Sequence, residues 1–417
     1  MAAEALVLIR ELLDGGDLKR AEVQIAKLMR AELDPAAQVQ AYILRARARL
    51  LGARPEDALD DLDAARALDD DAAQAAQIDV LSADAWFARF ELASVGFADR
   101  AHALRAYDIY SQIVHDHPDD EHLGWVYYQM GRICLTDDRT DEAIEHFQSA
   151  LMAPSPMPAL TAFCFERLGF THFYELRHPR RAHAFLEKAV FTYPTSADPV
   201  WLARVQTLRS RVLRELGDMR AALDAAEQAI AIAQESDESR LALADALITA
   251  GELMTQVGGR DRDVIAYLQQ FLQTARKPLG IDVTWSRVYE MLGGAYFNLG
   301  QHGAAGAAYE HALQHNPYHP WEIGLHYQIA RSYYQAEAYD KAVGAVDTLL
   351  QAAQKDHQTI SDYRIFDILG SAHFALKHYI AAHEAYDQAL KLAPSNASDL
   401  DKIKRYHQFA QELSAKA

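Results

Sequence analysis

Apolar and small residues recur along much of the chain at spacings of three and four, the spacing of one face of an α-helix. The segment 289–296 places Tyr, Leu, Gly and Tyr on one face, and the segment 305–312 continues with Ala, Tyr and Ala. Gly300 lies between them and supplies a backbone turn, and Pro317 stops the second helix. The pattern predicts a hairpin of two helices, which lie close together because Gly293 and the alanines are small.

The segment 366–394 repeats the arrangement of the segment 289–317. Counted from the bulky residue that opens each segment, Leu-Gly follows at offsets 3 and 4, Ala at 16, an aromatic residue at 20, Ala at 23 and Pro at 28. This arrangement resembles the tetratricopeptide repeat, a helix–turn–helix unit of about 34 residues. The windows 127–150 and 165–194 fit the same spacing, and further windows fit with decreasing fidelity.

The resemblance covers nearly the whole chain and implies an all-α fold. We expect a right-handed superhelical solenoid of about ten helix–turn–helix hairpins over residues 1–396, and a C-terminal capping helix over residues 397–417 that closes the exposed end. The expected hairpins span about residues 2–35, 38–71, 75–119, 124–157, 162–196, 203–236, 244–278, 286–319, 323–356 and 363–396.

Composition agrees with an all-helical chain. Alanine, the strongest helix former, occurs 75 times in 417 residues, whereas Gly occurs 20 times and Pro 13 times. The 59 acidic residues outnumber the 41 Lys and Arg. The resulting net charge of −18 argues against nucleic acid or an anionic membrane as the main partner.

Cysteine content and hydropathy bear on the compartment. No run approaches about 18 uninterrupted apolar residues, so we expect no membrane insertion. The two cysteines, Cys134 and Cys164, could form at most one bridge, and a chain of this size does not need one. We therefore expect a cytoplasmic protein, with Cys134 buried and unreactive in the core.

Nothing in the sequence signals a catalytic site. It contains no phosphate-binding glycine loop, no nucleophile elbow and no paired C-x-x-C motif, so we expect no enzyme and no cofactor. His311, His315 and His319 follow at spacings of four, but no carboxylate or cysteine completes a tetrahedral metal set, so we expect no metal. The acidic run 56–71 lacks the central glycine of a calcium loop, and we expect a solvated helix face.

Binding chemistry remains as the main possibility. In the tetratricopeptide family the first helix of each hairpin lines a concave groove, and here arginine and aromatic residues alternate at the inner positions. Arginine presents a planar fork that suits carboxylates and also stacks on rings. Phe163, Phe173 and Phe374 occupy inner positions as well. The predicted peptide-binding residues are Tyr128, Arg132, Arg167, Phe170, Tyr174, Arg204, Arg211, Arg214, Arg287, Tyr327, Arg331, Tyr334 and Arg364.

A structural role for the same residues is the alternative. Several of these aromatics would then belong to the core, and several arginines would pair with Glu166, Glu215 or Glu290. Some family members bind a partner's terminal carboxylate through Lys and Asn. This chain has Arg132, Arg211 and Arg331 at such positions without the Asn set, which argues against that clamp.

The resemblance implies a non-enzymatic scaffold or adaptor that binds an extended, acidic or aromatic peptide segment of a protein partner. Two alternatives remain open. A self-assembling structural protein would dock through solenoid edges as a homo-oligomer, because the helix from Ala2 has no preceding capping helix. A peptide-gated regulator of a partner enzyme would change its superhelical pitch.

Overall fold

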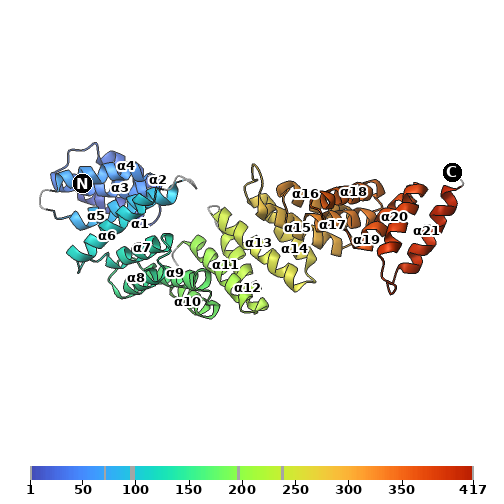
Figure 1. Ribbon diagram of the computed structural model, residues 1–417. Helices are drawn as coiled ribbons and strands as arrows, with labels where there is room; N and C mark the ends of the chain where they lie inside the picture. The colour runs from blue at the N-terminus through green and yellow to red at the C-terminus, as the bar shows by residue number, and fades with distance from the viewer. Residues whose placement is uncertain (1, 70–71, 94–98, 195–197, 236–238, 416–417) are drawn as a thin grey trace. The chain divides into compact units, whose positions relative to one another are not determined.

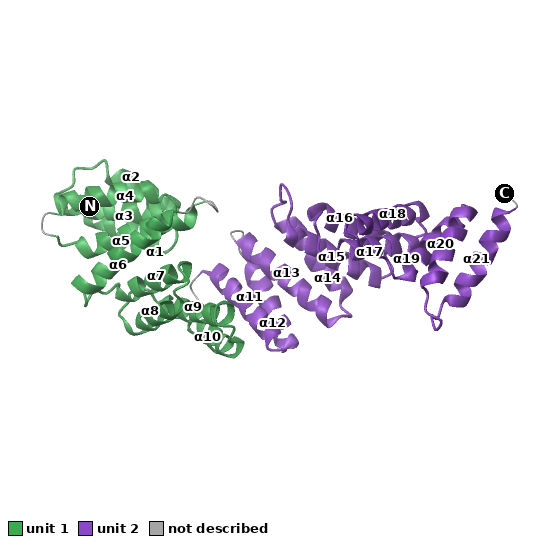
Figure 2. Ribbon diagram, in the orientation of Figure 1, with its two compact units in different colours: residues 1–197 green, residues 198–417 purple. Residues whose placement is uncertain are grey.

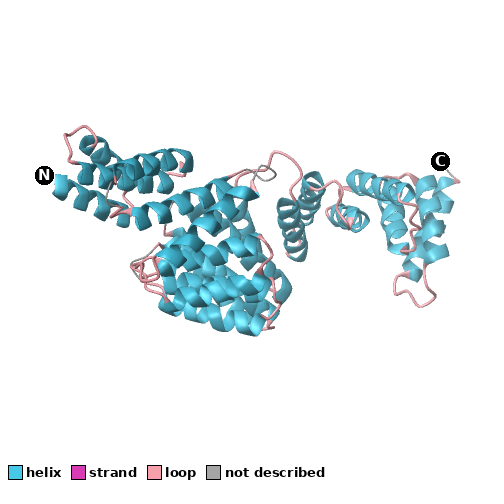
Figure 3. Cartoon of the chain, turned by 60° about the vertical axis from the view of Figure 1, so that its left-hand side comes forward, coloured by secondary structure: helices cyan, strands magenta, loops and turns pink. Residues whose placement is uncertain are grey.

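A computed structural model of the chain describes residues 2–69, 72–93, 99–194, 198–235 and 239–415. These residues form twenty-one α-helices and no β-strand (Figures 1 and 3). The all-α repeat fold expected from the sequence is confirmed. The helices are α1 (Ala2–Asp14), α2 (Leu18–Leu28), α3 (Pro35–Leu51), α4 (Pro55–Leu68), α5 (Ala75–Leu92), α6 (Arg100–Asp116), α7 (Leu123–Thr136), α8 (Thr140–Met152), α9 (Leu160–Tyr174), α10 (Pro179–Thr192), α11 (Pro199–Glu215), α12 (Met219–Gln234), α13 (Arg240–Val257), α14 (Asp261–Thr274), α15 (Val283–Asn298), α16 (His302–His315), α17 (Glu322–Gln335), α18 (Tyr339–Lys355), α19 (Tyr363–Ala375), α20 (Tyr379–Leu392) and α21 (Leu400–Ser414).

The chain divides into two compact units, unit 1 (Met1–Ala197) and unit 2 (Asp198–Ala417) (Figure 2). In each unit, an odd-numbered helix packs against the even-numbered helix that follows it, so consecutive helices form hairpins. Odd-numbered helices of successive hairpins also touch one another, as α5 touches α7 in unit 1 and α11 touches α13 in unit 2. The first helices therefore build a surface across successive hairpins from α1 to α9 in unit 1 and from α11 to α15 in unit 2, and Arg331 of α17 reaches the ring of Phe297 on α15. The predicted boundaries at residues 1, 71, 196, 236 and 417 lie outside the described residues.

A glycine on the first helix of a hairpin makes room for a large side chain on the second. A Cβ atom at Gly293 would lie 2.6 Å from the ring of Tyr309, closer than any side chain can approach. Tyr309 is itself buried, so its ring has nowhere to move. The same contact recurs at Gly131 with Phe147, Gly169 with Leu186, Gly251 with Leu268 and Gly370 with Tyr386. The regular spacing of a glycine and a large apolar residue in the sequence thus reflects a direct contact between the two helices of a hairpin.

The acidic run of residues 56–71 is only partly the solvated face expected from the sequence. Glu56, Asp60 and Asp63 are exposed, but Asp61 is 2% exposed. Its carboxylate accepts hydrogen bonds from Arg45 at 2.5–3.0 Å and is 2.7 Å from the guanidinium of Arg49. A buried charge needs such partners. The pattern of charges on α4 alone therefore does not reveal that Asp61 is buried. Asp70 and Asp71 lie outside the described residues.

The last helix covers the end of the stack in unit 2. Helix α21 packs against α20 and touches α19, and it buries Ile403 and Ala410 completely. Among the helices that the structure describes, none has the combination of length and apolarity that a membrane span requires.

Two glycine substitutions in unit 2 test the close contact between paired helices. We expect Gly293→Ala to lower the free energy of unfolding by about 1–3 kcal/mol, because the new methyl group overlaps the buried ring of Tyr309. Gly344→Ala on α18 is the matched control, since a Cβ there meets no atom within 4 Å. It should raise the free energy by about 0.5–1 kcal/mol through helix propensity alone. Urea denaturation followed by circular dichroism measures both, and effects of the same sign would contradict the packing described above.

Candidate functional site

Three of the predicted arginines in unit 2 form ion pairs between successive first helices. Arg211 on α11 pairs with Asp245 on α13. One turn further along, Arg214 lies 2.8 Å from Glu252 of α13, and Arg287 of α15 approaches the same carboxylate at 3.1 Å. Arg211 is neutralised by Asp245, whereas Arg214 and Arg287 share the single charge of Glu252, and these pairs hold neighbouring hairpins in register.

The two predicted arginines of the first helices of unit 1 are also paired with carboxylates. Arg132 on α7 pairs with Glu91 near the end of α5. Arg167 lies 2.8 Å from the carboxylate of its neighbour Glu166, one of the acidic partners that the structural alternative named. Its guanidinium also lies 5.4 Å from the ring centroid of Phe170. The pairing leaves little of either charge for a ligand.

The predicted aromatic residues of unit 1 pack against one another with their rings tilted or edge-on. Tyr128 is 7% exposed and packs among other rings, with its centroid 6.2 Å from that of Phe163. Phe170 and Phe173 flank Tyr174 at centroid distances of 4.7 and 4.8 Å. Tyr128 is therefore a core residue, while the other four remain partly exposed along the first helices.

Two of the predicted arginines have no carboxylate partner among the described residues. Arg204 is exposed on α11. Arg331 is exposed on α17, where its guanidinium lies 4.2 Å from the ring centroid of Phe297 on α15. A cation above an aromatic face is held in place but keeps its N–H donors free. Arg331 is therefore a fixed, available cation.

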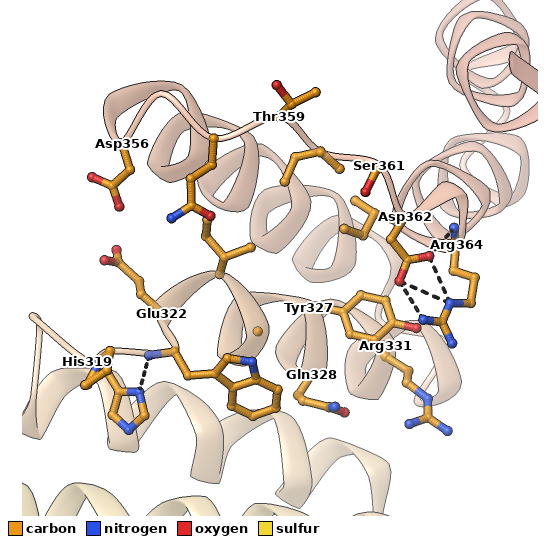
Figure 4. A pocket seen from close by; sticks show the side chains of 17 residues that line it. His319, Glu322, Tyr327, Gln328, Arg331, Asp356, Thr359, Ser361, Asp362 and Arg364 are labelled. Carbon is orange, nitrogen blue, oxygen red and sulfur yellow. Dashed lines mark hydrogen bonds and ion pairs between the residues drawn. The ribbon is translucent and has the colours of Figure 1, made fainter. Parts of the chain in front are cut away.

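A cleft of about 840 Å³ opens beside Arg331 in unit 2 (Figure 4). Its walls are residues 319–324 at the start of α17, further residues along that helix, and the connection from α18 to α19 between Asp356 and Ile365. It brings together three predicted site residues, Tyr327, Arg331 and Arg364. Tyr334 lies outside its walls, with its ring 5.9 Å from that of Tyr339.

Arg364 differs from Arg331 because it is paired. Its Nε and Nη2 donate to the two carboxylate oxygens of Asp362 at 2.9 and 2.6 Å (Figure 4). The hydrogen bonds from Arg364 lower the pKa of Asp362, and they raise the pKa of Arg364 in return. Asp362 also caps α19 by accepting from the backbone N–H of Arg364 at 3.0 Å. The pair belongs to the wall of the cleft.

Trp321 is a wall residue that sequence reasoning missed. Its indole lies directly over Gly324, where a Cβ would come within 2.0 Å of the ring. The side chain is nonetheless 49% exposed, so one part of the ring is seated and the rest faces the solvent. Its signal in the sequence is Pro320-Trp321 just before a helix, and this position lies outside the inner first-helix positions of the repeat pattern.

Carboxylates gather at the opposite end of the cleft from Arg331. Glu322 and Asp356 lie there near each other (Figure 4). The Glu322 carboxylate is 4.0 Å from the imidazole of His326, which would form an ion pair only if protonated. Burial lowers the pKa of His326, which favours the neutral form of the ring at neutral pH.

The histidine series makes contacts with its own surroundings. His311 shares a 2.9 Å hydrogen bond with Gln314, and His315 stacks at 5.5 Å on the ring of Tyr289. His319 accepts from the backbone N–H of Trp321 at 3.1 Å, which fixes the entry to α17. Within the described part of the chain, no three His, Cys, Asp or Glu side chains are placed to hold a metal ion.

Three segments match models of the tetratricopeptide repeat: residues 126–154, 286–319 and 364–396. They coincide with the hairpins α7–α8, α15–α16 and α19–α20, which contain three of the glycine contacts described above. The chain is a tetratricopeptide-repeat protein. No curated protein matches the sequence of this repeat protein.

Solved structures of similar fold belong to other repeat proteins. The apo form of the quorum sensor NprR from B. thuringiensis is 15% identical, with a TM-score of 0.51 over 75% of this chain and 86% of that chain. The C-terminal part of a TPR repeat-containing protein from Cytophaga hutchinsonii is 17% identical, with a TM-score of 0.45 over 66% and 98% of the two chains. At such identities the likeness to NprR shows the fold.

Charge reversal at one paired arginine and at one unpaired arginine tests which of them stabilises the fold of this tetratricopeptide-repeat protein and which is available to a ligand. We expect Arg211→Glu to lower the free energy of unfolding by about 1–3 kcal/mol, because a carboxylate would replace a charged hydrogen-bond donor beside Asp245. Arg331→Glu should cost less than about 1 kcal/mol, since it loses only the contact with Phe297. Chemical denaturation checks both, and a larger loss for Arg331→Glu would mean that Arg331 is the structural residue.

Proposed function

We propose that this protein is a non-enzymatic interaction scaffold that binds an extended segment of a partner protein on the surface of its first helices. Tetratricopeptide repeats act in general as protein-interaction modules, and stacked repeats provide extended binding surfaces. The observation that carries the proposal is the cleft in unit 2, where Trp321 is half-exposed and Arg331 is an unpaired cation fixed over a ring.

The paired arginines of unit 2 shape the binding surface and do not contact the ligand in this proposal. Arg211, Arg214 and Arg287 hold first helices against one another through carboxylates of α13. A ligand could reach them only by competing with pairs that already exist, which gives little net affinity. They therefore shape the surface, while the cleft and Arg204 supply groups that a ligand can use.

Charge and cysteine chemistry support a protein partner in the cytoplasm. The net charge of −18 disfavours nucleic acid as a ligand. Cys134 and Cys164 are buried and free, and burial raises the pKa of these thiols to about 11 and about 12. Such thiols are unreactive and suit a compartment where no disulfide is required.

Self-assembly is the second candidate, because apolar side chains are exposed on the connection into α15. Leu279, Ile281 and Val283 are all more than half exposed there. Surfaces of this kind mark contacts with other proteins, and a second copy of this chain is one such protein.

Selection from a displayed peptide library tests the scaffold proposal with the full-length chain. We expect the wild type to enrich peptides that share a pattern, and isothermal titration should show at least tenfold weaker binding to Trp321→Ala and Arg331→Glu. The loss follows because the two variants remove the exposed indole of Trp321 and the unpaired guanidinium of Arg331, the groups that the cleft offers to a ligand. Arg220→Glu on α12 is the matched control, since Arg220 is exposed outside the cleft and its reversal changes the net charge equally.

Two results would contradict the proposal. Recovered peptides that bind all three variants as tightly as the wild type would place binding away from the cleft. Failure to enrich any peptide, together with a mass by light scattering that rises with protein concentration, would favour self-assembly.

A further inference from the structure

The charges that line the cleft do not cancel locally. Arg331 has no carboxylate partner among the described residues, whereas Arg364, its cationic neighbour in the same wall, is neutralised by both oxygens of Asp362. One available positive charge therefore remains at this end of the cleft. Its planar fork of N–H donors matches a carboxylate.

The other end of the cleft keeps negative charge. Asp356 is exposed on the connection after α18 and has no cationic partner among the residues described. Glu322 has no Lys or Arg partner among the described residues; it lies 4.0 Å from the imidazole of His326, whose pKa burial lowers. Figure 4 shows both carboxylates on the side of the cleft away from Arg331 and Arg364. This end suits an ammonium or guanidinium group.

The distance between the two ends sets the length of a ligand. Glu322 and Arg331 are nine residues apart on α17, so at about 1.5 Å per residue and about 3.6 residues per turn their Cα atoms lie about 13 Å apart along its axis and half a turn apart around it, and both residues line the cleft. An extended peptide advances about 3.3 Å per residue, so side chains four positions apart are separated by a similar distance.

The cleft also has apolar and aromatic lining. The exposed part of the Trp321 indole, the half-buried ring of Tyr327 and Ile360 belong to its walls. Because Trp321 is seated on Gly324, its ring offers a fixed face to a flat or branched apolar side chain. Rigid aromatic groups of this kind dominate the energetics of binding surfaces.

We propose, building on the scaffold function above, that the cleft recognises an extended protein segment in which an acidic and a basic residue stand about four positions apart around an apolar or aromatic residue. The acidic side chain pairs with Arg331, and the basic one with Glu322 and Asp356. The apolar side chain packs on Trp321. The cleft thus distinguishes a segment of mixed charge from the purely acidic segment that its arginines alone suggested.

Fluorescence anisotropy with defined peptides tests this charge pattern on the full-length protein. The probes are blocked, labelled peptides with Asp and Arg four positions apart around a central Leu, made in both chain orders, together with Asp→Asn and Arg→Gln versions. We expect one order to bind wild type about fivefold or more tightly than either neutralised version, with the difference shrinking as salt rises. A peptide recovered from the library selection serves as the reference.

Charge reversal on the protein gives the sharper comparison. Arg331→Glu should lose its preference for the Asp peptide and bind a version with Lys in that position more tightly, whereas Arg220→Glu should behave like wild type. Equal binding of all versions to wild type, or no switch in Arg331→Glu, would overturn the charge pattern. If the reference peptide still binds wild type and not Trp321→Ala, the scaffold function survives that failure. If the reference peptide also fails to depend on Trp321, both proposals fall.

Discussion

The close approach of the two helices in each hairpin is the constraint on which the rest of the structure depends. A glycine on the first helix admits a large side chain from the second, as Gly131 admits Phe147 and Gly293 admits Tyr309. Successive hairpins also stack, and most neighbouring first helices within each unit touch one another. This stacking brings side chains from different hairpins together on one surface. There, an arginine of one first helix either pairs with a carboxylate or has no such partner.

The first-helix surface holds two kinds of arginine with different consequences. Arg211 and Arg214 reach across to carboxylates of the next hairpin, and such pairs order the stack at little net gain in stability. Arg331 rests on Phe297 with its donors free, beside a tryptophan seated on a glycine. The proposed scaffold function therefore assigns affinity for a partner segment to a small number of available groups, because most of the predicted arginines are engaged within the protein.

The fold could be predicted from the sequence because the contacts that define it are local. Gly293 and Tyr309 are 16 residues apart, so their spacing is visible in a single window. The site could be predicted only in part, since the partner of Arg211 is 34 residues away and that of Arg132 is 41 residues away, on neighbouring hairpins. No periodicity reveals such pairs, nor the hydrogen bonds that the carboxylate of Asp84 on α5 accepts from Trp125 and Gln129 of α7.

Hydrogen–deuterium exchange of the full-length protein with a library-selected peptide tests most directly whether the cleft in unit 2 is the binding surface. Binding should slow exchange over residues 319–331 and 356–365, which form its walls, and leave the second helices of unit 1 unchanged. Arg220→Glu should give the same pattern as wild type. Protection confined to other helices, with residues 319–331 unaffected by a peptide that binds, would contradict the assignment of the cleft.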